Sequence, residues 1–287
     1  MTRQTKDRLI EFSGRPLIMG VVNVTPDSFF DGGRHFDPEA AVAQAVRLVE
    51  EGADLLDVGP ESTRPGAEVV NEAEERRRAI PVVTAVAKAV TVPISIDTSK
   101  AIVAQAALDA GAVLVNDVTA LRGDHAMANV IARTGSGIVL MHMKGTPRTM
   151  QQAPRYEDVV GEISSFFEER IRFAMAHGIV RRQIILDPGI GFGKLLVHNL
   201  TLLAQLQDFM QFECPLLVGV SRKAFLGQIV NRPVQERLWA TAAAVAMAVD
   251  RGAGIIRVHD VGAMKDVVQV TAAISRQTSV PMKAQHA

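Results

Sequence analysis

Short apolar runs recur along the chain at intervals that suit strands alternating with helices. Eight of these runs are nearly continuous in hydrophobic residues, which is typical of parallel strands buried on both faces. They span residues 17–22, 55–58, 94–96, 113–115, 137–141, 184–186, 216–220 and 254–258. The pattern therefore predicts eight parallel strands.

Between these runs, apolar residues follow a helical spacing. The first helical segment opens with Pro38 and stops at Gly52, a typical start and end. Asn71 and Glu74 stand at capping-box spacing before the second, which we expect Pro81 to bend or break. Further helices are predicted for residues 99–110, 124–134, 157–177, 200–209, 234–251 and 261–275.

Strict alternation of eight strands with helices is typical of a (β/α)8 barrel. A doubly wound open sheet is the competing α/β fold, but no GxGxxG turn follows the first strand. A chain of 287 residues, 48% hydrophobic, is long enough for one such barrel. We predict a single domain over residues 1–287 with its core at about 16–278, and a small hairpin at residues 5–15.

The composition excludes several classes of protein. Lys and Arg together number 31 and so do Asp and Glu, so the net charge is zero and indicates no nucleic-acid or membrane partner. The single cysteine, Cys214, allows neither an intrachain disulfide nor a cysteine-rich metal site. The N-terminal segment lacks the apolar stretch of a signal peptide, and no run is long enough to span a bilayer. We expect a cytoplasmic protein.

Polar side chains follow or end every predicted strand. They include Asn23, Asp57, Asp97, Asn116, His142, Asp187, Lys223 and Arg257. Any one of them could be an ordinary helix cap or structural residue. In a barrel, however, the carboxyl ends of all eight strands meet at one mouth, where active sites lie. The set therefore predicts a polar site there.

Two kinds of chemistry can be read from this set. Arg257 and His259 are two residues apart, so they point to the same side of a strand, and with Arg64 and Asn23 they could hold a diphosphate. Asp97, Asn116, Asp187 and Lys223 offer hydrogen-bond donors and acceptors that suit the edge of a flat heterocycle. A structural salt bridge is the competing explanation for Asp187 and Lys223.

Two further features give weaker indications of function. Residues 189–194, Gly-Ile-Gly-Phe-Gly-Lys, resemble a phosphate loop but lack the Walker A spacing. We interpret them as a flexible turn beside the site, with Phe192 packing on a ligand ring. His142 has no partner at metal-ligand spacing, so we expect a hydrogen-bonded polar residue.

Five motifs together resemble those of a known family. They are NVTPDSFFDGG at 23–33, DVGPESTRPG at 57–66, DPGIGFGK at 187–194, GVSRK at 219–223 and RVH at 257–259. In this order and spacing, over residues 17–274, they resemble bacterial dihydropteroate synthases. The resemblance implies a homodimeric, Mg²⁺-using barrel transferase of folate biosynthesis that is a sulfonamide target. Its reaction joins 6-hydroxymethyl-7,8-dihydropterin diphosphate to p-aminobenzoate, giving 7,8-dihydropteroate and diphosphate.

The resemblance also implies a role for each matching residue. The pterin would contact Asp97, Asn116, Met141, Asp187, Phe192, Gly219 and Lys223. The diphosphate would contact Asn23, Thr63, Arg257 and His259, with Asn23 also on Mg²⁺. The p-aminobenzoate would contact Phe29, Thr63, Arg64, Pro65 and Ala224. Asp31, on a loop that closes over the diphosphate, would act in catalysis together with Lys223, Asp97 and Asp187.

One residue departs from the family pattern. Members often carry Ser directly after the lysine of the seventh strand, where it contacts the p-aminobenzoate carboxylate, but this chain has Ala224. Backbone N–H groups at the start of the following helix would remain as the anchor. We expect somewhat weakened binding of p-aminobenzoate.

Other functions remain open from the residues alone. A pterin-dependent methyltransferase barrel would also hold a pterin with Asp and Asn, but would leave the Arg257–His259 pair unexplained. A Schiff-base aldolase would use Lys223 as its amine. A non-catalytic pterin-binding homologue would keep the slot without turnover.

Overall fold

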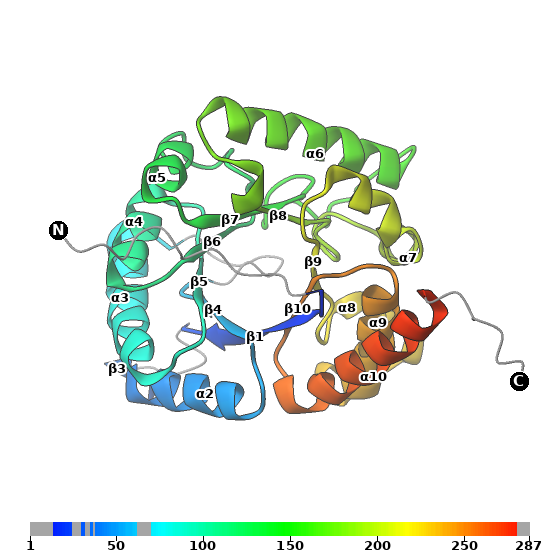
Figure 1. The fold of residues 1–287 in the computed structure, drawn as a ribbon, viewed down its shortest axis with the longest axis horizontal. Coiled ribbons are helices and arrows are strands. Elements are labelled where there is room, and N and C mark those ends of the chain that lie inside the picture. The colour runs from blue at the N-terminus through cyan, green and yellow to red at the C-terminus, as the bar shows by residue number, and fades with distance from the viewer. Residues whose placement is uncertain (1–13, 25–29, 32–34, 37, 62–69, 280–287) are drawn as a thin grey trace, which may run out of the picture.

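Eight parallel strands form a ring in the computed structural model, which describes residues 14–24, 30–31, 35–36, 38–61 and 70–279, with the backbone alone at 30–31, 35–36 and 277–279. The strand order is β8-β7-β6-β5-β4-β1-β10-β9. A bridge between Leu186 and Leu216 joins β8 to β9 and closes the ring. Figure 1 looks down this ring, with the helices arranged around it. The predicted (β/α)8 barrel is confirmed.

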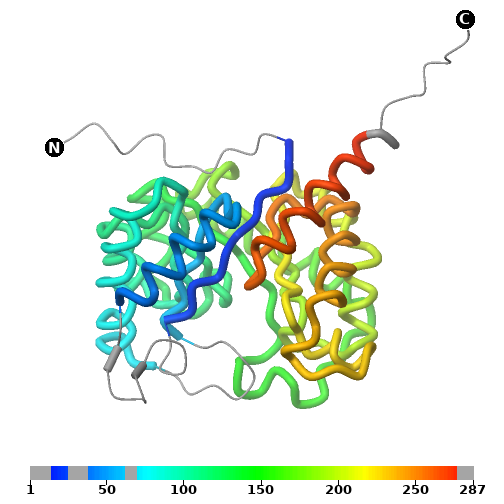
Figure 2. Tube along the Cα trace, turned by 90° about the horizontal axis from the view of Figure 1, so that it is seen from below, coloured from blue at the N-terminus to red at the C-terminus, as the bar shows by residue number. Residues whose placement is uncertain are grey.

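All eight predicted strands are present, within two residues of their predicted bounds. They are β1 (Leu17–Asn23), β4 (Leu55–Gly59), β5 (Ile94–Asp97), β6 (Leu114–Asp117), β7 (Gly137–Met141), β8 (Ile184–Asp187), β9 (Leu217–Gly219) and β10 (Ile255–Val258). In Figure 2, β1 runs from the upper to the lower edge of the molecule, so the carboxyl ends of the strands lie at the lower edge. A short antiparallel pair, β2 (Phe30–Asp31) with β3 (His35–Phe36), follows β1 along the chain.

The helices agree with the prediction less closely. They are α2 (Pro38–Glu50), α3 (Glu72–Ala89), α4 (Ala101–Ala110), α5 (Met127–Thr134), α6 (Val159–Ala176), α7 (Leu196–Ala204), α8 (Ala224–Val230), α9 (Leu238–Asp250) and α10 (Val261–Ser279). Three 3-10 helices, η1 (Arg181–Gln183), η2 (Leu206–Phe212) and η3 (Val234–Glu236), complete the set. The side chain of Asn71 accepts a hydrogen bond from the Glu74 N–H, as the capping pattern predicts.

Two of these helices correct the prediction. Helix α3 runs through Pro81 without a break, which excludes one of the two expected outcomes and leaves the bend a prediction. Because Pro81 is exposed, water can satisfy the backbone carbonyl that loses its N–H partner there. Helix α8 was not predicted. It has only seven residues and contains Gly227, so its sequence carries too little helical periodicity to be recognised.

Two separate apolar layers hold the barrel together. The larger lies between the strands and the surrounding helices and includes Val22, Leu56 and Phe167. The smaller fills the barrel interior with side chains from seven strands. Its members are Leu17, Met19, Leu55, Leu114, Val139, Ile185, Leu217 and Ile255. The interior is therefore a packed core, and a ligand can reach only the mouth above it.

The predicted hairpin at residues 5–15 lies almost wholly outside the described residues. At this end of the barrel, the Arg276 guanidinium donates to the Gly14 carbonyl at 3.2 Å, which links the end of α10 to the entry of β1. None of the described helices combines the length and the apolar character needed to cross a membrane.

Candidate active site

A hydrogen-bonded network around Arg257 crosses the mouth of the barrel. The Arg257 guanidinium donates to Asp57 Oδ2 at 2.7 Å and to Asp97 Oδ2 at 3.1 Å. Asn116 Nδ2 donates to the same oxygen of Asp57 at 3.0 Å. Strands β4, β5, β6 and β10 thus meet through four side chains, three of which the sequence predicts as site residues.

The charges in this network are unevenly balanced. Burial, together with the neighbouring Asp57 carboxylate, raises the pKa of Asp97 to about 8, although Arg257 opposes the shift. Burial alone would lower the pKa of Arg257, but Asp57 and Asp97 outweigh it and raise that pKa. Two carboxyl groups therefore share one cation, which leaves acceptor capacity for a ligand that brings N–H donors.

Asp187 and Lys223 form a second polar group in the mouth. Asp187 Oδ1 accepts from the Gly189 N–H at 2.7 Å, and the Lys223 amine donates to the Ile190 carbonyl. Burial raises the pKa of Asp187, which Lys223 opposes, and burial lowers the pKa of Lys223 to about 8. The two side chains form no direct ion pair, so a structural salt bridge does not explain them.

Apolar side chains line the predicted slot for a flat ring. Met141 packs with Val118, Met143 and Met150, and Phe192 packs against this cluster. The Lys223 amine lies 4.7 Å from the centroid of the Phe192 ring. Gly219 is paired with Arg257 in the sheet. A Cβ on Gly219 would lie 3.9 Å from both the Lys223 amine and the Arg257 Cβ, so the glycine leaves the space beside these two side chains open.

Two of the predicted diphosphate residues, Asn23 and His259, lie at the rim of the same mouth. His259 follows the end of β10, and its Nδ1 lies 2.9 Å from Ser221 Oγ. A Cβ placed on Gly59 would lie 3.8 Å from Asn23 Oδ1 and 3.9 Å from Asp97 Oδ2, so both oxygens lie close to that glycine. Asn23 is half-buried, and its amide oxygen is the kind of ligand that Mg²⁺ accepts.

Magnesium can bind through one or two protein oxygens while substrate phosphates and water supply the rest. Among the described residues, no three His, Cys, Asp or Glu side chains are grouped as metal ligands. The oxygen donors that are present, Asn23 and the nearby Asp97, fit a hard cation held mainly by a bound diphosphate.

Several predicted residues cannot be placed. Phe29, Thr63, Arg64 and Pro65 lie outside the described residues, and for Asp31 the structure describes only the backbone. Ala224 is the first residue of α8 and is exposed.

The segment 189–194 differs from its prediction as a flexible turn. The Lys194 amine donates to the Phe192 carbonyl at 2.9 Å, and the Tyr156 hydroxyl donates to the Gly193 carbonyl at 2.9 Å. The three glycines therefore serve a fixed, tightly packed turn rather than a loose one. His142 is buried, and its Nδ1 lies 3.0 Å from the Lys194 amine, so its prediction as a hydrogen-bonded polar residue is confirmed.

Asp57 belongs to the polar residues predicted at the mouth, but the sequence predicts no specific contact for it. Its carboxylate is fully buried and accepts from both Arg257 and Asn116. The available signal was an acidic residue within an otherwise apolar strand, because a buried carboxylate requires partners. Lys194 and Tyr156 were also not assigned, and only the fold brings them to the site.

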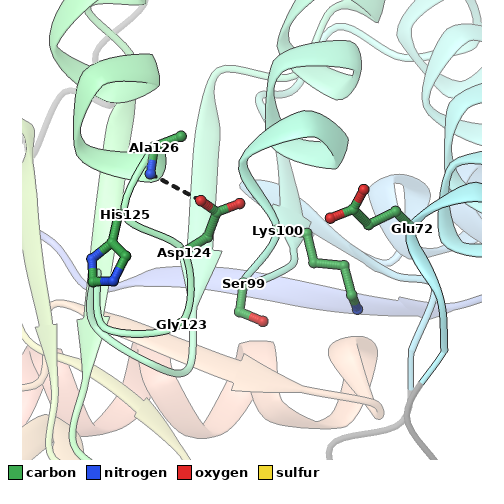
Figure 3. Close-up of a pocket in the computed structure, with 7 residues that line it drawn as sticks. All are labelled: Glu72, Ser99, Lys100, Gly123, Asp124, His125 and Ala126. Carbon is green, nitrogen blue, oxygen red and sulfur yellow. Dashed lines mark hydrogen bonds between the residues drawn. The ribbon is translucent and has the colours of Figure 1, made fainter.

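A separate open recess of about 630 Å³ lies between the start of α3 and the loops that follow β5 and β6 (Figure 3). Two of its charged side chains are already engaged: Asp124 accepts from the N–H groups of Ala101 and Ala126, and Lys100 pairs with Glu61 and Glu75. The network around Arg257 is therefore the better candidate site.

Comparison with known proteins agrees with this geometry. The model of the "Pterin binding enzyme" family matches residues 19–259. The dihydropteroate synthase of Escherichia coli strain K12 is 46% identical over 258 residues, covering 90% of this chain and 91% of that protein. The chain belongs to the pterin binding enzyme family, among its dihydropteroate synthases.

Other members of this family extend the likeness. The dihydropteroate synthase of Synechocystis is 44% identical over 269 residues, covering 93% of each chain. The Xanthomonas albilineans enzyme, solved with 4-aminobenzoic acid, has a TM-score of 0.88 at 45% identity and covers 96% of this chain and 98% of that one. The Yersinia pestis enzyme, solved as a sulfonamide drug complex, has a TM-score of 0.88 at 44% identity, covering 93% and 96%.

Proposed function

We propose that the mouth of this barrel carries out the dihydropteroate synthase reaction of folate biosynthesis. In that reaction 6-hydroxymethyl-7,8-dihydropterin diphosphate and p-aminobenzoate give 7,8-dihydropteroate and diphosphate. The observation that carries the proposal is the pairing of two polar groups across one mouth, Arg257 with Asp57, Asp97 and Asn116 on one side and Asp187 with Lys223 on the other. We also propose that residues 1–287 form a single domain.

The pterin ring would lie between these two groups. Asp97 and Asp187 are buried acceptors for its N–H donors, and Asn116 and Lys223 can donate to its ring nitrogen or oxygen atoms. Met141 and Phe192 would cover its faces, with Gly219 leaving room for the ring. This mixture of donors and acceptors suits a pterin better than a purely anionic ligand.

The diphosphate would lie at the rim, with Arg257, His259 and Thr63 as its contacts and Asn23 on Mg²⁺. When bound, Mg²⁺ would neutralise charge on the departing diphosphate. Arg257 is fixed by two carboxyl groups before substrate arrives, so its charge is already oriented toward the mouth. His259 is held through Ser221 in the same way.

The p-aminobenzoate would enter from the side of Phe29, Thr63, Arg64 and Pro65, with its carboxylate near the start of α8 at Ala224. In the reaction the bond between the pterin methylene carbon and the diphosphate oxygen breaks, and diphosphate leaves with the electron pair. The arylamine nitrogen then forms a bond to that carbon and loses a proton. Asp31 would meet the attacking amine and receive that proton, while Asp97 and Asp187 would stabilise positive charge on the pterin.

The arylamine is nucleophilic at neutral pH and needs no strong base. The site accordingly works by electrostatics and positioning, through Lys223, Arg257 and the two buried carboxyl groups.

A homodimer would use the faces of α9 and α10. These two helices pack together, and they carry the exposed apolar residues Trp239, Val270 and Ile274, with Trp239 81% exposed. Apolar surface exposed on neighbouring helices would be covered in such an interface. We expect a cytoplasmic dimer, which sedimentation of the purified protein would detect and which Trp239→Glu would weaken.

The proposed function is tested by incubating the purified protein with dihydropterin diphosphate and Mg²⁺, with and without p-aminobenzoate. We expect 7,8-dihydropteroate and diphosphate in equal amounts, loss of both with Lys223→Ala, and competition between a sulfonamide and p-aminobenzoate. Tight pterin binding without product would instead favour a methyltransferase or a non-catalytic homologue.

A further inference from the structure

Lys194 is a buried amine that the proposed reaction does not use. Its side chain belongs to a residue only 3% exposed, and it forms no ion pair with any described carboxylate. Its nitrogen lies 3.0 Å from His142 Nδ1, 2.9 Å from the Phe192 carbonyl oxygen and 3.4 Å from the His142 carbonyl oxygen. Burying a lysine without an anionic partner is costly, so a structural or functional reason is needed.

The partner of Lys194 is a neutral imidazole. Burial lowers the pKa of His142 to about 2, and the charge of Lys194 adds to this shift. His142 Nδ1 therefore accepts a hydrogen bond from the Lys194 amine rather than competing with it as a donor. The ring of His142 packs edge-on against Phe166 at 4.9 Å between centroids, so this acceptor is held in place.

The backbone of residues 189–193 presses closely on the segment that follows β7. A Cβ on Gly189 would lie 1.9 Å from the His142 carbonyl oxygen, and one on Gly193 would lie 2.4 Å from that of Lys144. Both glycines have positive φ, 66° and 64°. Lys194 makes the polar link across this contact, because it bonds to His142 on one side and to Phe192 on the other.

Other side chains hold the same loop as well. The Tyr156 hydroxyl donates to the Gly193 carbonyl at 2.9 Å. The side-chain amides of Gln151 and Asn199 bond to the carbonyl and the N–H of Gly191, at 2.7 Å and 2.6 Å. The loop thus has one defined position.

This position determines two features of the pterin slot. The Ile190 carbonyl accepts from the Lys223 amine, and the Phe192 ring lies 4.7 Å from that amine. Phe192 is also the residue whose carbonyl Lys194 holds. A movement of the loop would displace both the ring and the amine.

We infer that Lys194 is a positioning residue, which through the Phe192 and His142 carbonyl groups sets the place of the 189–193 loop and so of Phe192 and Lys223 in the slot. The inference rests on the proposed function for the identity of the ligand. It predicts that losing the amine impairs the pterin substrate selectively, because the p-aminobenzoate contacts lie on other loops.

The test compares Lys194→Met with Lys88→Met. The first variant keeps most of the length of the side chain but removes the amine, and the second makes the same change at an exposed position of α3. We expect Lys194→Met to raise the KM for dihydropterin diphosphate by roughly tenfold or more, since small misplacements in a site are costly. The KM for p-aminobenzoate should not rise and the thermal midpoint of unfolding should not fall. Lys88→Met should match the wild type in all three quantities.

Calorimetric titration of each variant with dihydropterin diphosphate measures the pterin effect without turnover. Tyr156→Phe, which removes the hydrogen bond to the Gly193 carbonyl, should show the same selective effect in smaller degree. This variant tests the inference if Lys194→Met does not fold. An unchanged KM for the pterin substrate, or equal losses for both substrates together with a lowered thermal midpoint, would overturn the inference. A wild-type protein that forms no dihydropteroate would instead refute the proposed function, while the titration still reports on the loop.

Discussion

The interior of this barrel contains two layers that differ in chemistry although the same strands build both. The lower layer includes Leu55, Leu114, Ile185 and Ile255, all apolar and buried. The residues two positions later on these strands are polar, and they form the upper layer. They are Asp57, Asn116, Asp187 and Arg257. Because side chains alternate along a strand, a step of two residues stays inside the barrel and moves upward by one layer.

The comparison separates stability from function within single strands. The lower layer removes apolar surface from water, which favours folding. The upper layer buries charged groups that partly repel one another, and burial raises the pKa of Asp97 and Asp187. Such an arrangement is unfavourable for folding and is explained by a ligand that completes it. Substitutions in the upper layer should therefore impair activity, whereas substitutions in the lower layer should reduce stability alone.

The largest effect is expected from Arg257→Met in the upper layer. The change leaves the buried Asp57 and Asp97 without their cation, which should lower the free energy of unfolding by about 3–5 kcal/mol. It should also lower kcat/KM by about 10²–10³, because a fixed cation toward the diphosphate is lost. Urea unfolding and initial rates measure the two effects. Arg77→Met, at an exposed pair with Glu74, is the control and should leave both nearly unchanged.

A loss of stability alone is expected from Leu114→Ala in the lower layer. Leu114 is 1% exposed, so its truncation should cost about 2–5 kcal/mol of unfolding free energy. Both KM values should stay at the wild-type level at a temperature where the variant is folded. A selective change in the pterin KM would show that the layers are not independent.

An effect on stability that depends on pH is expected from Asp97→Asn. The pKa of Asp97 is raised from 3.8 to about 8, so between these values the folded protein keeps a proton that the unfolded chain has lost. The wild type should therefore lose stability relative to Asp97→Asn as pH rises through this window, by at most about 1.4 kcal/mol per pH unit. Unfolding curves of both proteins from pH 5 to 8 check this, and parallel pH dependences would contradict it.

The smallest effect is expected from Ala224→Ser at the start of α8. A serine hydroxyl there could add one hydrogen bond to the p-aminobenzoate carboxylate, worth about 1 kcal/mol. The KM for p-aminobenzoate should fall, while that for the pterin substrate should not change. An unaltered KM for p-aminobenzoate would show that Ala224 does not weaken this anchor.

The sequence predicted most of the fold because each layer leaves a local signal. The near-continuous apolar runs located all eight strands, and the polar residue after each run located the mouth. Helix α8 was missed because it has only seven residues and contains Gly227, so it shows too little helical periodicity. Gly227 is close-packed in the fold, since a Cβ there would lie 2.4 Å from the Arg237 guanidinium.

The connections within the site could not be predicted in the same way. The bond from Arg257 to Asp57 joins residues 200 positions apart, and that from Lys194 to His142 joins residues 52 positions apart. Residue types and spacing indicate that such groups need partners, but only the closed ring determines which partner each one meets. The fixed turn at 189–193 was expected to be flexible for this reason.

The central claim is that the lower layer of a strand stabilises the fold, whereas the upper layer of the same strand serves the reaction. Strand β8 tests this claim most directly. Asp187→Asn and Ile185→Val are two residues apart on this strand, and both residues are buried. We would measure dihydropteroate formation and urea unfolding for both variants. The account predicts that Asp187→Asn lowers kcat/KM by about 10²–10³ without loss of stability, since it removes a buried charge. It predicts that Ile185→Val costs about 0.5–1.5 kcal/mol of stability with kcat/KM unchanged. Full activity in Asp187→Asn, or a selective loss of activity in Ile185→Val, would contradict it.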